Sequence, residues 1–76
     1  MNINIRTLTG QIYKINVKNT NVVNDLKFII EQKYGIPMER FVLTASGKYL
    51  LDNTPLSHYN ISENSTLYLV YRTCGG

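Results

Sequence analysis

The chain has only 76 residues, whereas most domains have about 100–150 residues. It is therefore long enough for one hydrophobic core but not for two. Domains near this size bury only about 60% of the surface that the unfolded chain exposes, so nearly every large apolar residue is needed for stability. A ligand pocket of roughly 300–1,000 Å³ would hollow out that core. We therefore expect function at the surface or at a terminus, and no enzyme activity, catalytic residues, cofactor or metal site.

The composition is that of an ordinary soluble domain, with 43% apolar and 17% charged residues. No apolar run approaches the roughly 18 residues that a membrane span requires, and the polar start at residues 1–4 is not typical of a signal peptide. We expect no membrane partner and a location in the cytoplasm, the nucleus or both. The single Cys74 cannot form an internal disulfide, so packing must hold the fold together.

The formal net charge is +3, and the basic residues are scattered from Arg6 to Arg72 without a Lys/Arg run. Such a balance favours solubility more than nucleic-acid binding. We expect a monomer that has no nucleic-acid partner.

Two alternating segments open the chain. Apolar residues at positions 1, 3 and 5, and again at 13, 15 and 17, alternate with polar residues, which is the period of a half-buried strand. Gly10 separates the segments and can adopt a positive φ angle. The pattern predicts a β-hairpin in which Ile12 points to the polar side.

An amphipathic helix is predicted next, because Val23, Leu26 and Ile30 recur at spacings of three and four. Gly35 should end the helix in the left-handed conformation. Thr20 or Asn21 is expected to cap its start. Two further apolar residues, at positions 28 and 29, widen the apolar stripe, so at least one of them should be exposed.

The second half of the sequence predicts further strands. Phe41 and Leu43 lie in a third strand, a turn at residues 46–47 leads to a short strand at 48–50, and residues 66–72 form the last strand, with Leu67, Leu69 and Tyr71 facing inward. Between the last two strands, a single helical turn contains Leu56. One helix covering one face of a sheet gives an α+β roll.

The sequence also resembles ubiquitin, without a gap over the whole chain. The shared residues include Met1, Thr7, Leu8, Thr9, Gly10, Gly35, Ile36, Pro37, Gly47, Lys48, Leu56, Ser57, Tyr59, Asn60, Ile61, Ser65, Thr66, Leu67, Leu69, Val70, Arg72, Gly75 and Gly76. The resemblance implies a β-grasp domain over residues 1–72, a mixed five-stranded sheet packed on one helix, with the first and last strands parallel and central. Residues 73–76 are expected to form a mobile tail.

The resemblance implies a ubiquitin-like protein modifier. Gly76 would be the acyl donor, activated by ATP, carried as a thioester and joined to lysines of target proteins, and Gly75 would be the slim residue that leads into the enzyme channels. Arg72 would be recognised by acidic groups of the activating enzyme. The implied partners are activating and conjugating enzymes, deconjugating proteases, proteins that bind ubiquitin-like domains, and target lysines. Release from a precursor, by a protease or by an intein-like neighbour, is compatible with the sequence.

The main recognition patch of ubiquitin is matched only in part. Its counterparts here are Leu8, Gly47 and Val70 with Lys48 beside them, but Thr44 replaces its central isoleucine and Tyr68 its histidine. Outward Val42, Tyr49 and Tyr68 would give either an aromatic interaction surface or ordinary sheet surface. We expect weak binding to receptors of ubiquitin.

Lys27, Lys33 and Lys48 are the counterparts of lysines used for ubiquitin chains. The resemblance places Lys27 opposite Asp52 in a partly buried ion pair, which leaves Lys48 and Lys33 as candidate chain acceptors. Lys48 also fits an ordinary solvated turn lysine.

Cys74 is interpreted as an incidental free thiol, because nothing near it in sequence would lower its pKa and His58 is expected in a surface turn. Two other functions remain open for the chain. One is a non-covalent ubiquitin-like interaction domain of a larger protein, and the other is a sulfur carrier whose terminal carboxylate becomes a thiocarboxylate.

Overall fold

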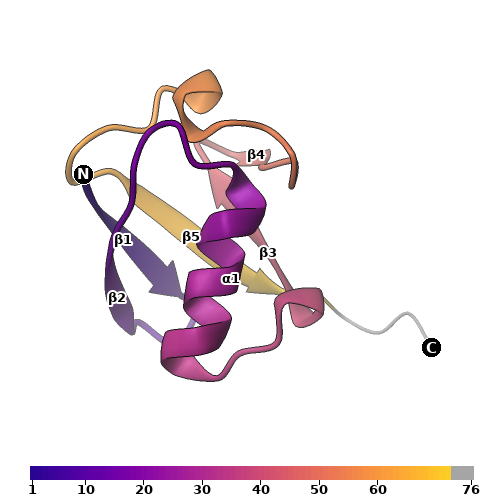
Figure 1. The fold of residues 1–76 in the computed structure, drawn as a ribbon. Coiled ribbons are helices and arrows are strands. Elements are labelled where there is room, and N and C mark those ends of the chain that lie inside the picture. The colour runs from indigo at the N-terminus through magenta and orange to yellow at the C-terminus, as the bar shows by residue number, and fades with distance from the viewer. Residues whose placement is uncertain (73–76) are drawn as a thin grey trace.

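Helix α1 (Val23–Tyr34) lies across one face of a five-stranded sheet in the computed structural model, which describes residues 1–72 (Figure 1). The strands lie in the order β2-β1-β5-β3-β4. Their bounds are β1 (Asn2–Thr7), β2 (Ile12–Asn16), β3 (Phe41–Ala45), β4 (Lys48–Tyr49) and β5 (Thr66–Tyr71). Strands β1 and β5 are parallel, and the other neighbouring strands are antiparallel. The predicted β-grasp arrangement, with a mixed sheet and β5 at its centre, is confirmed.

The N-terminal hairpin forms as its alternation predicts, with Ile3 opposite Ile15 in the register of β1 and β2. Gly10 has a φ angle of 89°, and the backbone N–H of Gln11 donates to Thr7 Oγ1 at 3.1 Å. Ile12 is exposed on the polar side of the hairpin, as predicted.

The helix ends where the sequence predicts but begins differently. Gly35 has a φ angle of 71°, and its N–H donates to the carbonyl of Glu31. Neither Thr20 nor Asn21 is the N-cap residue. Val22 occupies that position, and its side chain cannot accept a hydrogen bond. Its own N–H donates to Asp25 Oδ2 at 3.0 Å, so a carboxylate inside the first turn of the helix stabilises the helix start instead.

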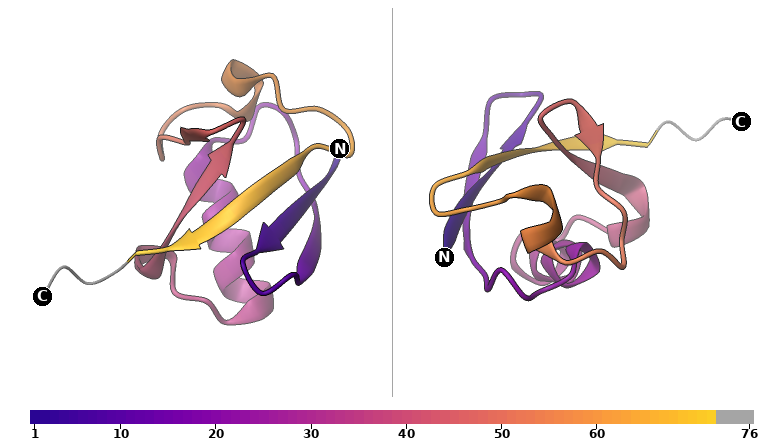
Figure 2. Two further views of the ribbon diagram at one scale, coloured as in Figure 1. Left: turned by 180° about the vertical axis from the view of Figure 1, so that it is seen from behind. Right: turned by 90° about the horizontal axis from the view of Figure 1, so that it is seen from above.

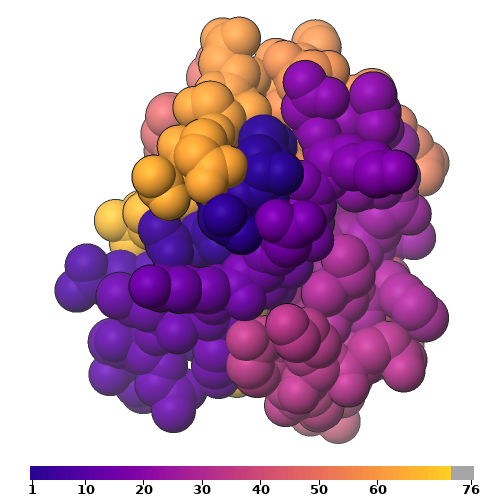
Figure 3. Space-filling view, turned by 60° about the vertical axis from the view of Figure 1, so that its left-hand side comes forward, coloured from indigo at the N-terminus to yellow at the C-terminus, as the bar shows by residue number. Residues whose placement is uncertain are grey.

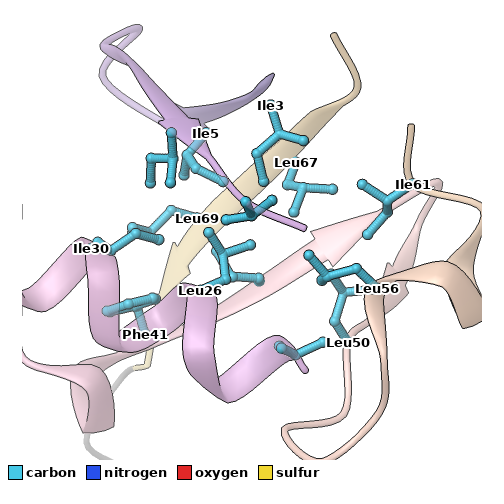
Figure 4. Close-up of a cluster of buried hydrophobic side chains, with 14 of the residues drawn as sticks. Ile3, Ile5, Leu26, Ile30, Phe41, Leu50, Leu56, Ile61, Leu67 and Leu69 are labelled. Atoms are coloured by element: carbon cyan, nitrogen blue, oxygen red, sulfur yellow. The ribbon is translucent and has the colours of Figure 1, made fainter. Parts of the chain in front are cut away.

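The core lies between α1 and the sheet, where side chains from both layers point toward one another (Figure 4). Leu26 and Ile30 of α1 are fully buried. They face apolar residues of the sheet and of the segments that close its ends, which include Ile3, Ile5, Phe41, Leu43, Leu50, Leu56, Ile61, Leu67 and Leu69. Phe28 lies outside this layer and is 52% exposed, which confirms the prediction that the apolar stripe is wider than the core.

Two 3₁₀ turns connect the remaining elements. The predicted single turn is η2 (Leu56–Tyr59), with Leu56 buried in the core. The sequence did not indicate η1 (Met38–Arg40), where Glu31 Oε2 accepts a hydrogen bond from the N–H of Met38 at 3.0 Å. These turns close the two ends of the space between helix and sheet (Figure 1).

The prediction that Tyr71 faces the core is wrong, because this side chain is 54% exposed. Tyr71 is the last residue of β5 and pairs with Phe41, the first residue of β3. The strand therefore continues past the edge of the core, and the alternation of sides no longer corresponds to burial.

The hairpin and the helix are also joined at the surface. The rings of Tyr13 and Tyr34 stack with their centroids 4.0 Å apart and an interplanar angle of 19°. In Figure 3 the atoms of the hairpin, coloured indigo to purple, lie directly against those of the helix and the residues after it, coloured magenta. This contact fixes β2 against the C-terminal turn of α1.

Candidate functional site

The face of the sheet that is turned away from α1 carries most of the predicted interaction residues (Figure 2, left). Thr44 of β3 is the register partner of Tyr68 of β5, and Val42 is the partner of Val70. Thr44 and Val70 are half-buried, whereas Tyr68 is exposed. Three predicted residues therefore lie side by side on two adjacent strands.

Two turns border this group. Leu8 is highly exposed in the turn after β1, and the preceding residue Thr7 is paired with Leu69, next to Val70. Gly47 has a φ angle of 78° in the turn between β3 and β4. We call Leu8, Thr44, Gly47, Lys48, Tyr68 and Val70 the sheet patch. The role of these residues as an interaction surface stays a prediction.

The chemistry of the sheet patch differs from its rim to its centre. Leu8 and Val70 offer apolar surface, but Thr44, the register partner of both Tyr68 and Tyr49, places a hydroxyl in the middle. A partner that buries a purely apolar side chain here would leave that hydroxyl without water, which costs free energy unless it gains a hydrogen bond. The surface is suited to a partner that combines apolar and hydrogen-bonding groups.

Arg72 directly follows β5, and its N–H donates to the carbonyl of Arg40 at 2.8 Å. This bond fixes the backbone at the point where the chain leaves the sheet, at the end of the molecule where η1 lies (Figure 1). The Arg72 side chain is exposed. The predicted acyl donor Gly76, the residue before it, Gly75, and Cys74 lie outside the described residues.

The three candidate lysines occupy different environments. Lys33 is exposed in the last turn of α1, on the side of the sheet opposite the sheet patch, and Lys48 is exposed in β4. Lys27 is buried, and its ammonium lies 3.2 Å from Asp52 Oδ1 and 5.6 Å from the centroid of the Phe41 ring. The expected ion pair with Asp52 is present.

Residues 1–72 contain no group of three or more histidine, cysteine, aspartate and glutamate side chains placed to hold a metal ion. The ring of His58 lies edge-on to that of Tyr59, with centroids 5.2 Å apart. In this part of the chain, no helix is both long and apolar enough to cross a membrane.

One carboxylate near the start of β1 is strongly engaged. Glu63 Oε1 accepts a hydrogen bond from the N–H of Asn2 at 2.8 Å, and Oε2 accepts one from Asn2 Nδ2 at 3.0 Å. These hydrogen bonds, the backbone one first, lower the pKa of Glu63 because they stabilise its charged form. Glu63 thus connects the segment before β5 to β1.

Two exposed apolar residues near Arg72 were not predicted from the sequence as surface residues with a role. Leu51 follows β4 and is 68% exposed, and Tyr71 is exposed at the end of β5. The alternation of the last strand indicated a buried Tyr71, and Leu51 lies in a loop, where periodicity gives no signal. Only their exposed fractions in the structure identify them.

Residues 3–74 match the ubiquitin family. The chain is 37% identical to the ubiquitin-like protein NEDD8 of Dictyostelium discoideum over 76 residues, which are 100% of this chain and 99% of the relative. It is 36% identical to the NEDD8-like protein RUB3 of Arabidopsis thaliana, covering 100% of this chain and 97% of the relative. It is also 37% identical to a probable ubiquitin receptor RAD23 of Oryza sativa subsp. japonica, over 95% of this chain but 19% of that protein.

Proposed function

Since this chain belongs to the ubiquitin family, we propose that it is a ubiquitin-like modifier that is joined through Gly76 to lysines of other proteins. Its full-length correspondence to NEDD8 and RUB3 is the observation that carries this proposal, because both relatives are covered almost end to end. Gly75 and Gly76 are the counterparts of the two glycines of ubiquitin in the resemblance described above. The globular part then serves as a recognition unit for enzymes that act on its carboxyl group.

The proposed reaction has three steps. The carboxylate of Gly76 attacks the α-phosphate of ATP, which forms an acyl-adenylate and releases pyrophosphate. A cysteine thiolate of an activating enzyme then displaces AMP and forms a thioester. Finally, the uncharged amine of a target lysine attacks the thioester carbonyl, the isopeptide bond forms, and the thiol leaves. Gly75 has no side chain, which lets the chain adopt extended angles in a narrow enzyme channel.

Arg72 supports this proposal by its position, four residues before Gly76 at the exit of the chain from the sheet. Its exposed guanidinium can form charge-assisted hydrogen bonds with carboxylates of the activating enzyme. Val70 of the sheet patch and Arg72 line the same hollow. The sheet patch would be recognised by conjugating enzymes, deconjugating proteases and proteins that bind ubiquitin-like domains. We place this activity in the cytoplasm, the nucleus or both.

Lysine environments limit which chains can be built. Lys48 and Lys33 are exposed, so an incoming thioester can reach their amines. Lys27 is held in its buried ion pair with Asp52, and its amine becomes available only after local opening of the structure. We propose Lys48 and Lys33 as acceptors and exclude Lys27.

A second function, a non-covalent ubiquitin-like interaction domain within a larger protein, is favoured by another observation. The chain matches 19% of the length of RAD23 and 46% of the length of ubiquitin-like protein 4A of Rattus norvegicus, to which it is 33% identical. In both relatives the matching part lies within a longer chain. For such a domain, the sheet patch would function without any chemistry at Gly76.

The two functions are separated by incubating the purified 76-residue protein with ATP and a lysate of the host cell, and then comparing gels run with and without a reducing agent. The modifier proposal expects a larger species that reductant removes, which is a thioester, and other species that resist reductant, which are isopeptides. Gly76→Ala is the matched control, because it alters the acyl donor and leaves the described fold untouched.

Each outcome selects one function. Adducts that form with the wild type and not with Gly76→Ala support the modifier. An unchanged wild-type protein supports the interaction domain. Replacement of one carboxylate oxygen by sulfur, detected by intact-protein mass spectrometry, would support a sulfur carrier instead.

A further inference from the structure

A polar hollow of about 430 Å³ lies over β2, β1 and the start of β5, three strands that are neighbours in the sheet (Figure 2, left). At its centre, Asn4 of β1 has two register partners, Lys14 of β2 and Thr66 of β5. Arg6 follows on the same face of β1. These residues line the hollow together with Asn2, Ile12 and Asn64. We call this surface the hairpin hollow, and it shares no residue with the sheet patch.

One end of the hairpin hollow is already hydrogen-bonded within the fold. Asn16 Nδ2 donates to Asn2 Oδ1 at 2.9 Å, and Asn2 Nδ2 donates to Glu63 Oε2 at 3.0 Å. The other carboxylate oxygen of Glu63 accepts from the backbone N–H of Asn2. A ligand therefore gains little at this end, where the negative charge of Glu63 would also repel an anion.

The other end presents two cations without an anionic partner. Arg6 and Lys14 are exposed, and neither belongs to the one ion pair found within residues 1–72, that of Lys27 and Asp52. The two basic residues are diagonal neighbours on adjacent strands, a placement in which long side chains can reach one another. No residue that lines the hairpin hollow is acidic. The charge here is therefore balanced only when an anion binds.

Neutral donors lie beside these cations. Within residues 1–72, the side chains of Asn4 and Thr66 take part in no hydrogen bond. The amide of Asn4 and the hydroxyl of Thr66 can both donate to an anion. The hairpin hollow thus combines two positive charges with two neutral donors, on three adjacent strands.

This set of groups suits a phosphoryl group better than a carboxylate. A phosphorylated side chain carries about −1.5 to −2 charge at pH 7 and three acceptor oxygens, whereas a carboxylate carries one charge and two oxygens. Ile12, which is 54% exposed, forms an apolar wall of the same hollow. A free phosphate ion leaves that wall uncovered, but a polypeptide that carries the phosphate can cover it with a neighbouring side chain.

Two other occupants fit less well. Sites for single-stranded nucleic acid stack bases on aromatic side chains, and no aromatic residue lines the hairpin hollow. A second copy of this chain would bring a further net charge of +3 toward the same cations, and like charges disfavour such an association.

We propose that the hairpin hollow binds a phosphorylated serine or threonine of a partner protein. The phosphoryl oxygens accept charge-assisted hydrogen bonds from the guanidinium of Arg6 and the ammonium of Lys14. Asn4 and Thr66 donate the remaining hydrogen bonds, and a side chain next to the phosphorylated residue covers Ile12. This binding needs no reaction at Gly76, so it goes beyond the proposed modifier function.

The test uses arrays of short peptides with random flanking sequences. Each flanking sequence is made in four versions, with phosphoserine, phosphothreonine, serine or glutamate at its centre, and the arrays are probed with the wild-type protein. The best phosphopeptides are then titrated into ¹⁵N-labelled protein. We expect their dissociation constants to be at least about tenfold lower than those of the serine and glutamate versions. The largest chemical-shift changes should fall on residues of the hairpin hollow.

Charge substitutions locate the site. Arg6→Gln and Lys14→Gln should each raise the dissociation constant of the phosphopeptide about fivefold, because each removes one charged donor. Lys14→Arg keeps the charge and should stay within about twofold of the wild type. Lys18→Gln is the matched control, since it removes the same charge from an exposed lysine outside the hollow, and it should change the constant less than about twofold. Amide spectra show whether each variant is folded.

Several results would overturn the proposal. Arrays in which no phosphorylated version binds better than its serine version would exclude a phosphate site, and equal binding of the glutamate version would indicate a carboxylate site. An effect of Lys18→Gln as large as that of Lys14→Gln would indicate attraction by net charge alone. Oligouridylate that shifts the same amides at a lower concentration than the phosphopeptide would identify a nucleic-acid site instead.

Discussion

The ammonium group of Lys27 lies 3.2 Å from Asp52 Oδ1, and the two side chains differ in exposure, at 4% for the lysine and 50% for the aspartate. The lysine belongs to α1 and the aspartate to the loop after β4, so the ion pair joins the helix to the far edge of the sheet. A buried charge that loses its partner is costly, whereas an apolar residue of similar shape in its place is tolerated. Loss of the aspartate is therefore expected to destabilise the protein more than replacement of the lysine by an apolar residue.

Asp52→Ala should lower the free energy of unfolding by roughly 1–3 kcal/mol, because the buried ammonium of Lys27 is left without its partner. Lys27→Met should stay within about 1 kcal/mol of the wild type, since the half-exposed aspartate retains water. Urea denaturation followed by circular dichroism measures both values. The double variant should resemble Lys27→Met alone, and a larger loss for Lys27→Met than for Asp52→Ala would refute this account of the pair.

Leu69→Ala should destabilise the protein by about 2–5 kcal/mol, because this side chain is fully buried in the middle of β5. The same substitution at exposed Leu51 should change the free energy of unfolding by no more than about 0.5 kcal/mol. Both variants can be measured by the same denaturant titration. Equal effects at the two positions would contradict the assignment of the core.

The hydrogen bonds between Glu63 and Asn2 predict a pH dependence of stability. They hold the pKa of Glu63 below its ordinary value, so the folded state releases this proton more readily than the unfolded state. The resulting stabilisation is present above the unfolded pKa of about 4.3 and is lost as pH falls through the lower folded pKa. Glu63→Gln should therefore have a lower melting temperature than the wild type at pH 6, and the difference should shrink below about pH 4. A difference that stays constant from pH 6 to pH 3 would show that Glu63 does not contribute in its charged form.

The centre of the sheet patch predicts selectivity against receptors of ubiquitin. Thr44→Ile combined with Tyr68→His should raise the affinity for a ubiquitin receptor domain roughly tenfold, because an apolar side chain replaces a hydroxyl that binding would desolvate. Thr66→Ile is the matched control, since Thr66 lies on the same strand as Tyr68 but outside the sheet patch. Isothermal titration calorimetry gives the dissociation constants. Tight binding of the receptor domain by the wild-type protein would show that the Thr44 hydroxyl does not weaken this interaction.

Local patterns in the sequence were sufficient to predict most elements of this fold. Alternation located the strands of the hairpin, and glycine chemistry located the end of α1 at Gly35. The parallel pairing of β1 with β5 joins segments about sixty residues apart, and no local pattern contains it. That pairing came from the resemblance to ubiquitin.

The sequence-based predictions that were wrong have physical causes. A helix capped by a carboxylate three residues inside it, as Asp25 caps the N–H of Val22, leaves no conventional residue at the N-cap position to recognise. Tyr71 was misplaced because alternation tells which side of a strand a residue faces but not where the core ends.

The proposed modifier function is tested most directly by the peptide that trypsin leaves on a target. Cleavage after Arg72 would leave the remnant Thr73, Cys74, Gly75 and Gly76 on the acceptor lysine, a mass that can be recognised in a digest of host cells producing the tagged protein. We predict this remnant on lysines of other proteins in cells that produce the wild type, and its absence with Gly76→Ala. Recovery of the wild-type protein only in unmodified form, with no lysine carrying the remnant, would contradict the proposal.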